Sequence, residues 1–506
     1  MSSKDTKTIY TFPGGIVPSG IGAAAGIESL CLSTAEAADA FSGVFAVPLT
    51  FSPSGSGAAA VAVGDKVFRG SYIGRADGDT DLPMFSGVSG TVRELIPSAS
   101  GDGSFAVVID SDGKFTPVPG AEPFEKRISE TSPEEIVSMI RLGGVITSSP
   151  FRRGEPLCRI LERAVKSGKL KRFIVNCTEC GSFIASSRRL ILEDPASVIN
   201  GAKIILRALG LSLADLVMNE NDPDAVNALR GTCGSNPLFR TRLVKYKYPQ
   251  SSDRMIVNAL TGRCIAAEAA VEEAGYVVVD ASVCADIFRL FATGLPKTDC
   301  TVTVDGAGVS EPAVLTLPAG TPVSDVLSLC RADLSAPNFV TDGDEMTGRE
   351  PITVPGVGGV LTVLSTSVLV FPEQKKKADL PVSACIRCGR CSDVCPVDAA
   401  PLYIARNIAA GNMKKAVAFG LDCCISCGAC TYVCPVGIPL SQIIRDAKNA
   451  KNAKNAKKNV AEEPTEEKII DKIDIDNEEI TETEGKTDVP TVTDDPEGEN
   501  EEAEEI

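Results

Sequence analysis

Residues 385–396 (CIRCGRCSDVCP) and 424–435 (CISCGACTYVCP) carry one cysteine pattern twice. Each copy reads C-x2-C-x2-C-x3-C-P, the spacing typical of bacterial chains that bind [4Fe–4S] clusters. The first three thiolates lie close enough along the chain to wrap one cluster. The fourth lies too far away and, in two-cluster proteins, ligates the other cluster. The two stretches therefore predict a ferredoxin module that holds two [4Fe–4S] clusters.

The crossed spacing assigns each expected metal ligand to one cluster. The first cluster takes three cysteines from the first run and one from the second: Cys385, Cys388, Cys391 and Cys434. The second cluster takes the reverse set: Cys424, Cys427, Cys430 and Cys395. Gly389 and Gly428 follow the second cysteine of each run and leave the backbone room to fold around sulfur. Cys423, next to Cys424, is out of phase with the run and is not expected to be a standard ligand, with ligand swapping as the alternative.

Zinc knuckles and a disulfide framework are the alternative interpretations of these cysteines. Zinc sites often combine cysteine with histidine, and the chain contains no histidine. Disulfide frameworks belong to short secreted chains, whereas this chain has 506 residues and an N-terminus, MSSKDTKTIY, without the apolar core of a secretory signal. The absence of histidine also removes a histidine general base, a Ser-His-Asp triad and a Rieske centre. Electron transfer needs none of these, so the composition favours iron–sulfur clusters.

The net charge of −17 is concentrated at one end of the chain. Residues 461–506 contain 20 Asp and Glu against 3 Lys, which leaves 47 acidic and 47 basic residues in the remainder. The tail has no aromatic residue and cannot bury enough surface to offset its ordering entropy, so it is expected to be disordered. No basic patch with interleaved aromatic residues is present, which argues against nucleic-acid binding. The eighteen cysteines favour a reducing compartment, and no stretch is apolar and long enough for a transmembrane helix, so a protein that is soluble or peripheral is expected.

Changes of pattern along the chain predict a multidomain α/β and α+β protein. Short alternating strands with glycine turns, such as residues 61–74 and 84–95, indicate a small sandwich. Strands that alternate with helices from Ser132 onward indicate a parallel sheet. The expected segments are an N-terminal segment (1–45), a barrel-sandwich hybrid (46–125), a Rossmann-like α/β domain (126–298), a β-grasp-like domain (299–372), the ferredoxin module (373–447) and a disordered acidic tail (448–506).

Individual elements can be placed within the α/β segment. A helix is expected to begin at Ser132-Pro133, where a serine N-cap precedes proline and two acidic residues. A second helix is expected over 195–209 and to end at Gly210. Apolar runs predict strands over 172–176, 214–218, 255–260 and 276–280.

Further elements are expected toward the C-terminus. Residues 300–330 predict two strands followed by a helix capped by Thr321 or Ser324. Short helices are expected over 398–410 and 440–447 beside the cysteine loops. The Lys-Asn-Ala repeat over 448–458 either begins the disordered tail or continues the last of these helices.

This order of parts resembles the C subunit of Rnf-type electron transport complexes. The related cobalamin reductase of propanediol microcompartments shares the layout. The resemblance implies that residues 126–298 form a degenerate domain of NADH/FMN type and that residues 299–372 form an SLBB-like domain. The resemblance covers roughly residues 10–445, and four short motifs carry it beside the cysteine runs: Phe12-Pro13-Gly14-Gly15-Ile16, Asn176-Cys177-Thr178-Glu179-Cys180, Lys247-Tyr248-Pro249-Gln250 and Gly320-Thr321-Pro322-Val323. The family implies a peripheral subunit that accepts electrons from NADH through FMN and passes them through its clusters to membrane partners.

The nucleotide-binding motifs of the family are altered in this chain. The family's glycine-rich G-x-GGAGFP loop corresponds to residues 143–151 (GGVITSSPF), which keep Gly143, Gly144 and Pro150 but lack the middle glycines. Side chains at those positions would crowd a bound pyrophosphate. The family's E-D-N-K-P stretch is NENDP here, and Asp222 stands in place of the lysine, where a phosphate favours a positive charge. We therefore expect that neither FMN nor NADH binds and that NADH dehydrogenase activity of its own has been lost.

Cys177 and Cys180 form one further C-x2-C pair. They are interpreted as the end of a buried strand beside the old flavin pocket, with a third metal or redox site as the alternative. The predicted function is that of an electron-transfer subunit, with no catalytic residues of its own. Its expected partners are other subunits of a membrane electron transport complex, with a flavoprotein or a ferredoxin as donor. One alternative is an NADH:FMN-dependent or cobalamin-reductase-like subunit with a remodelled flavin site. The other is an interaction protein in which the clusters only stabilise the fold of the C-terminal module.

Overall fold

The structure is a computed structural model of the chain. It describes residues 8–17, 29–30, 41, 43–51, 55–76, 82–99, 103–124, 128–147, 149, 151–152, 154–179, 181, 183–266, 269–333, 335, 338–372 and 381–462. Among these residues, no helix combines the length and the apolarity that crossing a bilayer requires.

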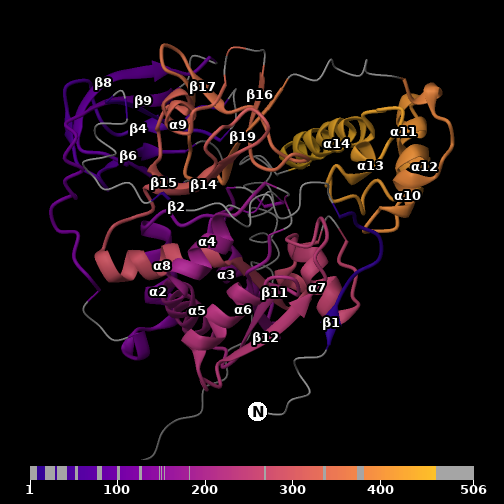
Figure 1. The fold of residues 1–506 in the computed structure, drawn as a ribbon, viewed down its shortest axis with the longest axis horizontal. Helices are drawn as coiled ribbons and strands as arrows, with labels where there is room; N and C mark the ends of the chain where they lie inside the picture. The colour runs from indigo at the N-terminus through magenta and orange to yellow at the C-terminus, as the bar shows by residue number, and fades with distance from the viewer. Residues whose placement is uncertain are drawn as a thin grey trace, which may run out of the picture. The chain divides into compact units, whose positions relative to one another are not determined.

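A five-stranded parallel sheet organises the α/β part of the chain (Figure 1). Its order is β1-β12-β11-β10-β13, in which the strands are β1 (Ile9–Tyr10), β10 (Arg172–Asn176), β11 (Ala214–Asn219), β12 (Phe239–Val244) and β13 (Tyr276–Asp280). The chain moves outward from β10 through β11 to β12 and then returns to place β13 on the other side of β10. Because the strand order reverses between β10 and β13, the loops that follow these two strands leave in opposite directions. This opens a crevice at the carboxyl ends of β10 and β13.

Helices cover this sheet and supply most of its apolar core. They are α2 (Pro133–Leu142), α3 (Leu157–Lys166), α4 (Ser186–Glu193), α5 (Pro195–Leu209), α6 (Pro223–Cys233), α7 (Asp253–Thr261) and α8 (Ala281–Thr293), with short 3-10 turns η3 (Ile128–Glu130) and η4 (Glu272–Ala274). The predicted start of α2 is confirmed: Ser132 and Glu135 form a reciprocal capping box. The predicted end of α5 is also confirmed, because Gly210 caps it in the left-handed conformation.

Three of the four predicted strands of this segment are confirmed as β10, β11 and β13. The strand predicted over 255–260 is wrong, because these residues belong to helix α7. Ser252 precedes this helix, Asp253 lies in its first turn and Gly262 ends it in the left-handed conformation. A short apolar run has no periodicity that separates a buried strand from a buried helix, and the flanking residues decided the outcome.

Two antiparallel sheets form the predicted sandwich. One sheet has the order β3-β9-β8-β5, with β3 (Val44–Pro48), β9 (Ser104–Ser111), β8 (Gly90–Pro97) and β5 (Lys66–Val67). The other has the order β4-β6-β7, with β4 (Ala58–Ala59), β6 (Tyr72–Arg75) and β7 (Pro83–Phe85). Alternate side chains of both sheets, such as Ile73 and Val107, lie in one shared core.

A mixed sheet follows in the next part of the chain. Its order is β16-β19-β14-β15-β2, with β14 (Asp299–Asp305), β15 (Ala313–Pro318), β16 (Asn338–Asp342), β19 (Ser367–Pro372) and β2 (Ser29–Leu30). A hairpin of β17 (Ile352–Val354) and β18 (Gly358–Val360) and helix α9 (Val323–Leu329) complete it. The predicted strand-strand-helix order is confirmed, but the predicted cap is wrong. Pro322 occupies the N-cap of α9, and the Thr321 hydroxyl instead donates to the Pro318 carbonyl.

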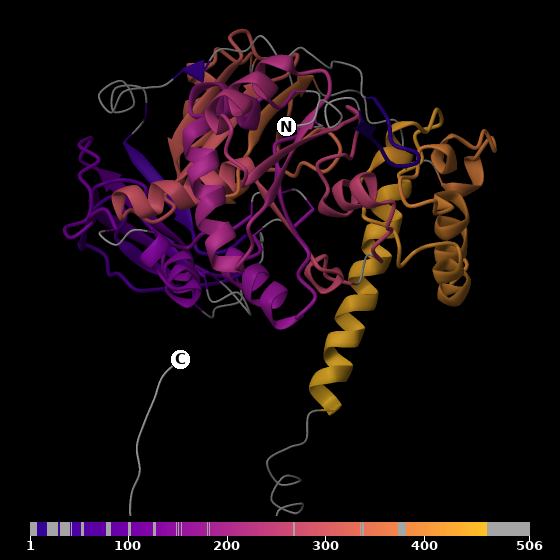
Figure 2. The same ribbon diagram turned by 90° about the horizontal axis from the view of Figure 1, so that it is seen from below.

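Helices surround the cysteine loops in the predicted places. They are η5 (Val382–Ala384), α10 (Arg390–Asp393), α11 (Pro401–Ala409), α12 (Met413–Ala418), α13 (Ala429–Tyr432) and α14 (Leu440–Glu462). The Lys-Asn-Ala repeat lies within α14, which Figure 2 shows as one long continuous helix. The start of the disordered tail expected at residue 448 is thereby corrected, because residues 448–462 are helical. Residues 463–506, to which the rest of that prediction applies, lie outside the described residues.

Candidate iron–sulfur sites and the pocket of the parallel sheet

The eight predicted cysteine ligands line two separate cavities. The first, here called the outer cavity, is lined by the four cysteines Cys385, Cys388, Cys391 and Cys434. The second, here called the inner cavity, is lined by Cys395, Cys424, Cys427 and Cys430. The fold therefore brings the fourth cysteine of each run to the three cysteines of the other run. Thiolates gathered four at a time in this way are the donor set that a [4Fe–4S] cluster requires.

The two cysteine runs have the same backbone geometry. Arg387 and Ser426 occupy equivalent positions, each with a positive φ, and their backbone N–H groups donate to the sulfurs of Cys385 and Cys424 at 3.3 Å. In the next turn the backbone N–H of Ala399 donates to the sulfur of Cys395 at 3.3 Å. The N–H of Ile438 makes the equivalent contact to Cys434 at 3.4 Å. Because N–H donors stabilise the negative charge of cluster sulfur, these contacts fit a reducible centre in each cavity.

Two segments from the distant N-terminal and α/β parts of the chain hold the inner cavity. The first is the turn over residues 12–16, in which the backbone N–H of Gly15 donates to the Val394 carbonyl at 2.9 Å. The second is the loop over 247–251, in which the buried Tyr248 hydroxyl donates to the Cys427 carbonyl at 2.5 Å. The two segments are also joined to each other, because Ile16 and Tyr248 exchange backbone hydrogen bonds. The cysteine loops of the inner cavity are thus held against the body of the protein.

Lys247 ties the N-terminal turn to this loop. Its ammonium group donates to the carbonyl oxygens of Phe12 and Gly14, and it lies 3.9 Å from the centre of the Phe12 ring. Burial, with a smaller contribution from Lys245, lowers the pKa of Lys247 to about 8. Through these contacts Lys247 holds the turn over 12–16 against the loop over 247–251.

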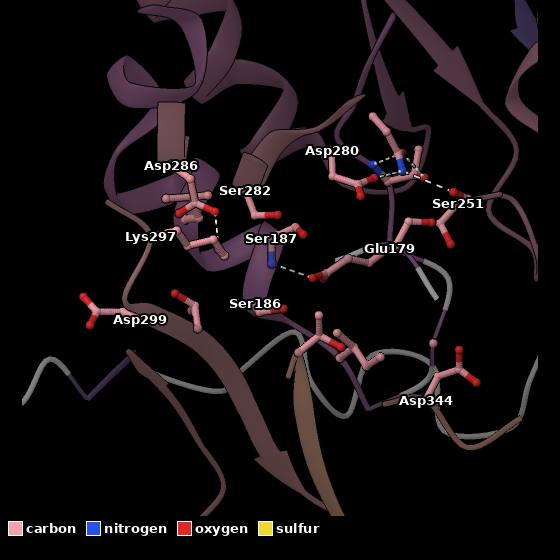
Figure 3. A pocket seen from close by; sticks show the side chains of 18 of the residues that line it. Glu179, Ser186, Ser187, Ser251, Asp280, Ser282, Asp286, Lys297, Asp299 and Asp344 are labelled. Carbon is pink, nitrogen blue, oxygen red and sulfur yellow. Dashed lines mark hydrogen bonds and ion pairs between the residues drawn. The ribbon is translucent and has the colours of Figure 1, made fainter. Parts of the chain in front are cut away.

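A polar pocket opens at the switch point of the parallel sheet (Figure 3). Asn176 and Asp280, at the carboxyl ends of β10 and β13, both line it, and the amide of Asn176 donates to Asp280 at 2.7 Å. The same amide donates to the carbonyl of Ser251, which lines the pocket, and Tyr248 of the same loop contacts the Cys427 carbonyl. Most of the remaining lining is carboxyl and hydroxyl, with Ile184 and Leu190 as its apolar side chains.

The basic side chains of this pocket are already paired, and two of its carboxyls have raised pKa values. Its two basic side chains, Arg289 and Lys297, both pair with Asp286. Burial raises the pKa of Glu179 to about 8, even though Ser187 donates its backbone N–H to the carboxyl at 2.6 Å. Burial, together with the neighbouring Asp253, raises the pKa of Asp280 to about 7. A ligand phosphate would therefore meet buried acids and cations that are already paired.

The raised pKa of Glu179 predicts a pH-dependent stability. The carboxyl titrates near 4.5 in the unfolded chain and near 8 in the folded protein, so its contribution is complete below 4.5 and is lost as the pH rises through 8. Glu179→Gln should therefore lose less thermal stability than the native chain between about pH 5 and about pH 9. The difference in unfolding free energy should be on the order of a few kcal/mol. Glu193→Gln, an exposed change in α4, is the control, and parallel profiles for all three proteins would contradict the assignment.

Gly143 and Gly144, the two glycines that this chain shares with the family's glycine-rich loop, pack closely against other parts of the protein. A side chain at Gly143 would meet the side chain of Leu290 in α8. Gly144 has a φ of +63°, and a Cβ there would lie 2.9 Å from the ring of Phe85 and 3.0 Å from the Pro83 carbonyl. Neither glycine lines the pocket. Pro150 lies outside the described residues.

Asp222 has a different role from the one expected. Its carboxylate accepts from the backbone N–H of Ala225 as the N-cap of α6 and pairs with Arg188 at 2.8 Å. It does not line the pocket, but its negative charge contributes, in addition to burial, to the raised pKa of Glu179, which does line it. Cys177 is buried at the end of β10, as predicted, whereas Cys180 lies outside the described residues. Cys423 is exposed and lines neither cysteine cavity.

Residues 12–16 and 247–250, which contact the cysteine loops, belong to motifs of the family and are not predicted from the sequence to be part of a site. One feature of the sequence does point to this contact: Gly14 and Gly15 are consecutive glycines, and both adopt a positive φ. Two adjacent glycines in this conformation mark a close approach of backbone to backbone.

Known protein families match three parts of the chain. Residues 10–114 match the RnfC barrel sandwich hybrid domain, residues 154–289 the Nuo51 FMN-binding domain and residues 381–438 the 4Fe-4S dicluster domain. The barrel-sandwich and iron–sulfur predictions are thereby confirmed. Among solved structures, a chain of an NAD+-reducing [NiFe]-hydrogenase has 15% identity and a TM-score of 0.44 over 64% of this chain and 62% of its own.

Two curated relatives extend over most of the chain. The C subunit of the Na(+)-translocating ferredoxin:NAD(+) oxidoreductase complex of Acetobacterium woodii is 28% identical over 68% of this chain and 76% of its own length. The C subunit of the ion-translocating oxidoreductase complex of Rhodobacter capsulatus is 31% identical over 76% of this chain and 73% of its own. This confirms the resemblance expected from the motifs, and the chain belongs to the family of C subunits of Rnf-type ion-translocating oxidoreductase complexes.

Proposed function

We propose that this protein is the electron-transfer subunit of such a complex and relays single electrons through two [4Fe–4S] clusters. The observation that carries the proposal is the pair of four-cysteine cavities. Each takes three ligands from one run and the fourth from the other, which supports the crossed ligand assignment. The clusters supply the redox chemistry, and the chain holds them and surrounds them with N–H donors.

The surroundings of the two cavities favour a relay with distinct ends. Cys427 of the inner cavity is buried, whereas Cys388 of the outer cavity is exposed. The inner cluster would exchange electrons within the body of the protein, and the outer cluster would exchange them with other subunits or with a flavoprotein or ferredoxin donor. A position on the cytoplasmic side of the membrane, peripheral to membrane-bound partners, fits this division.

We also propose that the pocket of the parallel sheet binds neither FMN nor NADH. The glycines of the former phosphate loop pack against Leu290 and Phe85, and the pocket's basic side chains are paired with Asp286. The strand order supports a Rossmann-like domain whose nucleotide site has degenerated. In the mixed sheet, the central parallel pair β14 and β19 and helix α9 support a β-grasp domain of SLBB type.

The match to the Nuo51 FMN-binding domain favours a second candidate function. In this alternative the chain keeps a remodelled flavin site and oxidises NADH itself. Ser251 lines the pocket and Tyr248 contacts the Cys427 carbonyl, so the loop over 247–251 would connect a flavin in the pocket to the cysteine loops of the inner cluster.

Anaerobic reconstitution separates the two candidates. The relay predicts about eight irons per chain, the content of two [4Fe–4S] clusters, no bound flavin, and clusters that dithionite reduces but NADH does not. Iron, flavin and electron paramagnetic resonance (EPR) signals would be measured on the same sample. Stoichiometric FMN, with EPR signals that develop on addition of NADH, would establish the second candidate and refute the relay.

A further inference from the structure

The outer cavity opens on an exposed face that is both basic and apolar. The face is defined by Ile386, Arg387, Arg390, Tyr403 and Arg406, all of which line the cavity. Ile386 and Tyr403 are 64% and 50% exposed. Exposed Ile and Tyr side chains beside a redox centre are more typical of a contact surface than of a solvated loop.

The arginines of this face have no acidic partner within the described part of the chain. No ion pair involves Arg387, Arg390 or Arg406 there, and no carboxylate lines the outer cavity. Residues 381–447 contain six basic residues (Arg387, Arg390, Arg406, Lys414, Lys415 and Arg445) against four acidic ones (Asp393, Asp398, Asp422 and Asp446), in a chain of net charge −17. The positive charge is therefore a local property of the module and is greatest at the cluster.

The apolar part of the surface continues onto the neighbouring helix. Tyr403 stacks on Phe419 with 5.1 Å between ring centres, and Phe419 is itself 38% exposed. Met413 and Val417 of α12 are also exposed, with Lys414 and Lys415 between them. The surface thus combines a few rigid aromatic and aliphatic contacts with unpaired cations, the composition of an interface that forms by electrostatic steering.

We propose that this face docks an electron-transfer protein whose own redox centre is surrounded by carboxylates. Unpaired arginines recognise carboxylates in a bidentate manner, and the apolar contacts exclude water between the two centres. A small, charge-steered contact suits an electron-transfer complex, which must form and separate in each turnover. The proposal rests on the relay function and adds the chemistry of its partner.

The test is the rate at which a reduced acidic two-cluster ferredoxin reduces the reconstituted full-length protein in stopped flow. Arg406 is the residue to change, because it lies on α11 and outside the cysteine loops. Arg406→Glu should lower the second-order rate constant about fivefold at low salt and weaken its dependence on ionic strength. Arg406→Lys should restore most of the rate. Lys166→Glu, at the exposed end of α3, changes the net charge equally and should have no effect.

Reduction by dithionite separates this proposal from the relay itself. If the native protein contains no clusters that dithionite reduces, the relay function fails. If the clusters take electrons from dithionite but Arg406→Glu and Lys166→Glu react equally fast with the ferredoxin, only the docking face is refuted. If Arg406→Glu instead loses binding to phosphatidylglycerol vesicles while its rate with the ferredoxin is unchanged, the face contacts lipid and the proposal is overturned.

Discussion

Removing Cys388 and Cys434 together should eliminate one cluster and leave the other. Both cysteines line the outer cavity, so the Cys388→Ala/Cys434→Ala double variant should retain about four irons per chain. Cys388→Ala/Cys395→Ala removes one ligand from each cavity and should retain almost none. Iron content and EPR spin quantitation of the reduced proteins would measure the difference. The comparison tests which cysteines share a cluster, because both variants lack the same number of thiols.

The adjacent cysteine Cys423 provides the control. It is exposed, lines neither cavity and lies next to the ligand Cys424, so Cys423→Ser should retain about eight irons. Four irons in Cys388→Ala/Cys395→Ala, with none in Cys388→Ala/Cys434→Ala, would mean that each run binds its own cluster. That result would contradict the crossed assignment and the two cavities on which the relay rests.

The grouping of the eight cysteines around two cavities could be predicted because short cysteine spacings restrict the chain locally. Three thiolates within one loop and a fourth beyond its reach leave few arrangements. Helices with strong end signals were predicted for the same reason: Ser132 and Glu135 cap α2 reciprocally, and Gly210 ends α5. Around α7 the apolar run alone predicts a strand, whereas the flanking residues Ser252 and Gly262 mark the two ends of a helix.

Contacts between distant segments could not be predicted in this way. Strand β2 joins β15 from the N-terminal segment, and residues as far apart as Phe45 and Val302 share one core across two segments that were expected to be separate domains. The pairing of Asp222 with Arg188 is of this kind, because the two residues are remote in sequence. The contacts of residues 12–16 and 247–251 with the cysteine loops are another case, since no local pattern states which surface a turn will contact.

The second large effect is expected at Gly14, where the N-terminal turn meets the cysteine module. A Cβ at this position would lie 2.5 Å from the Cys395 carbonyl oxygen and 3.1 Å from the Val394 carbonyl carbon. Both are backbone atoms, so the contact cannot be relieved by a rotamer change. Gly14→Ala should push the turn away from Cys395, the ligand that the first run contributes to the inner cavity. Iron content should fall toward about four per chain, with loss of the inner cluster's EPR signal.

Gly210→Ala separates this clash from the general cost of a positive φ. Gly14 and Gly210 both have a φ of +64°, but a Cβ at Gly210 meets no atom within 4 Å. Each substitution should cost about 1–2 kcal/mol of stability through backbone strain. Only Gly14→Ala should add about 1–3 kcal/mol from overpacking, and only it should lose iron. If both variants kept full iron and lost equal stability, the turn would not position Cys395, and the inner cluster would be held by its own module alone.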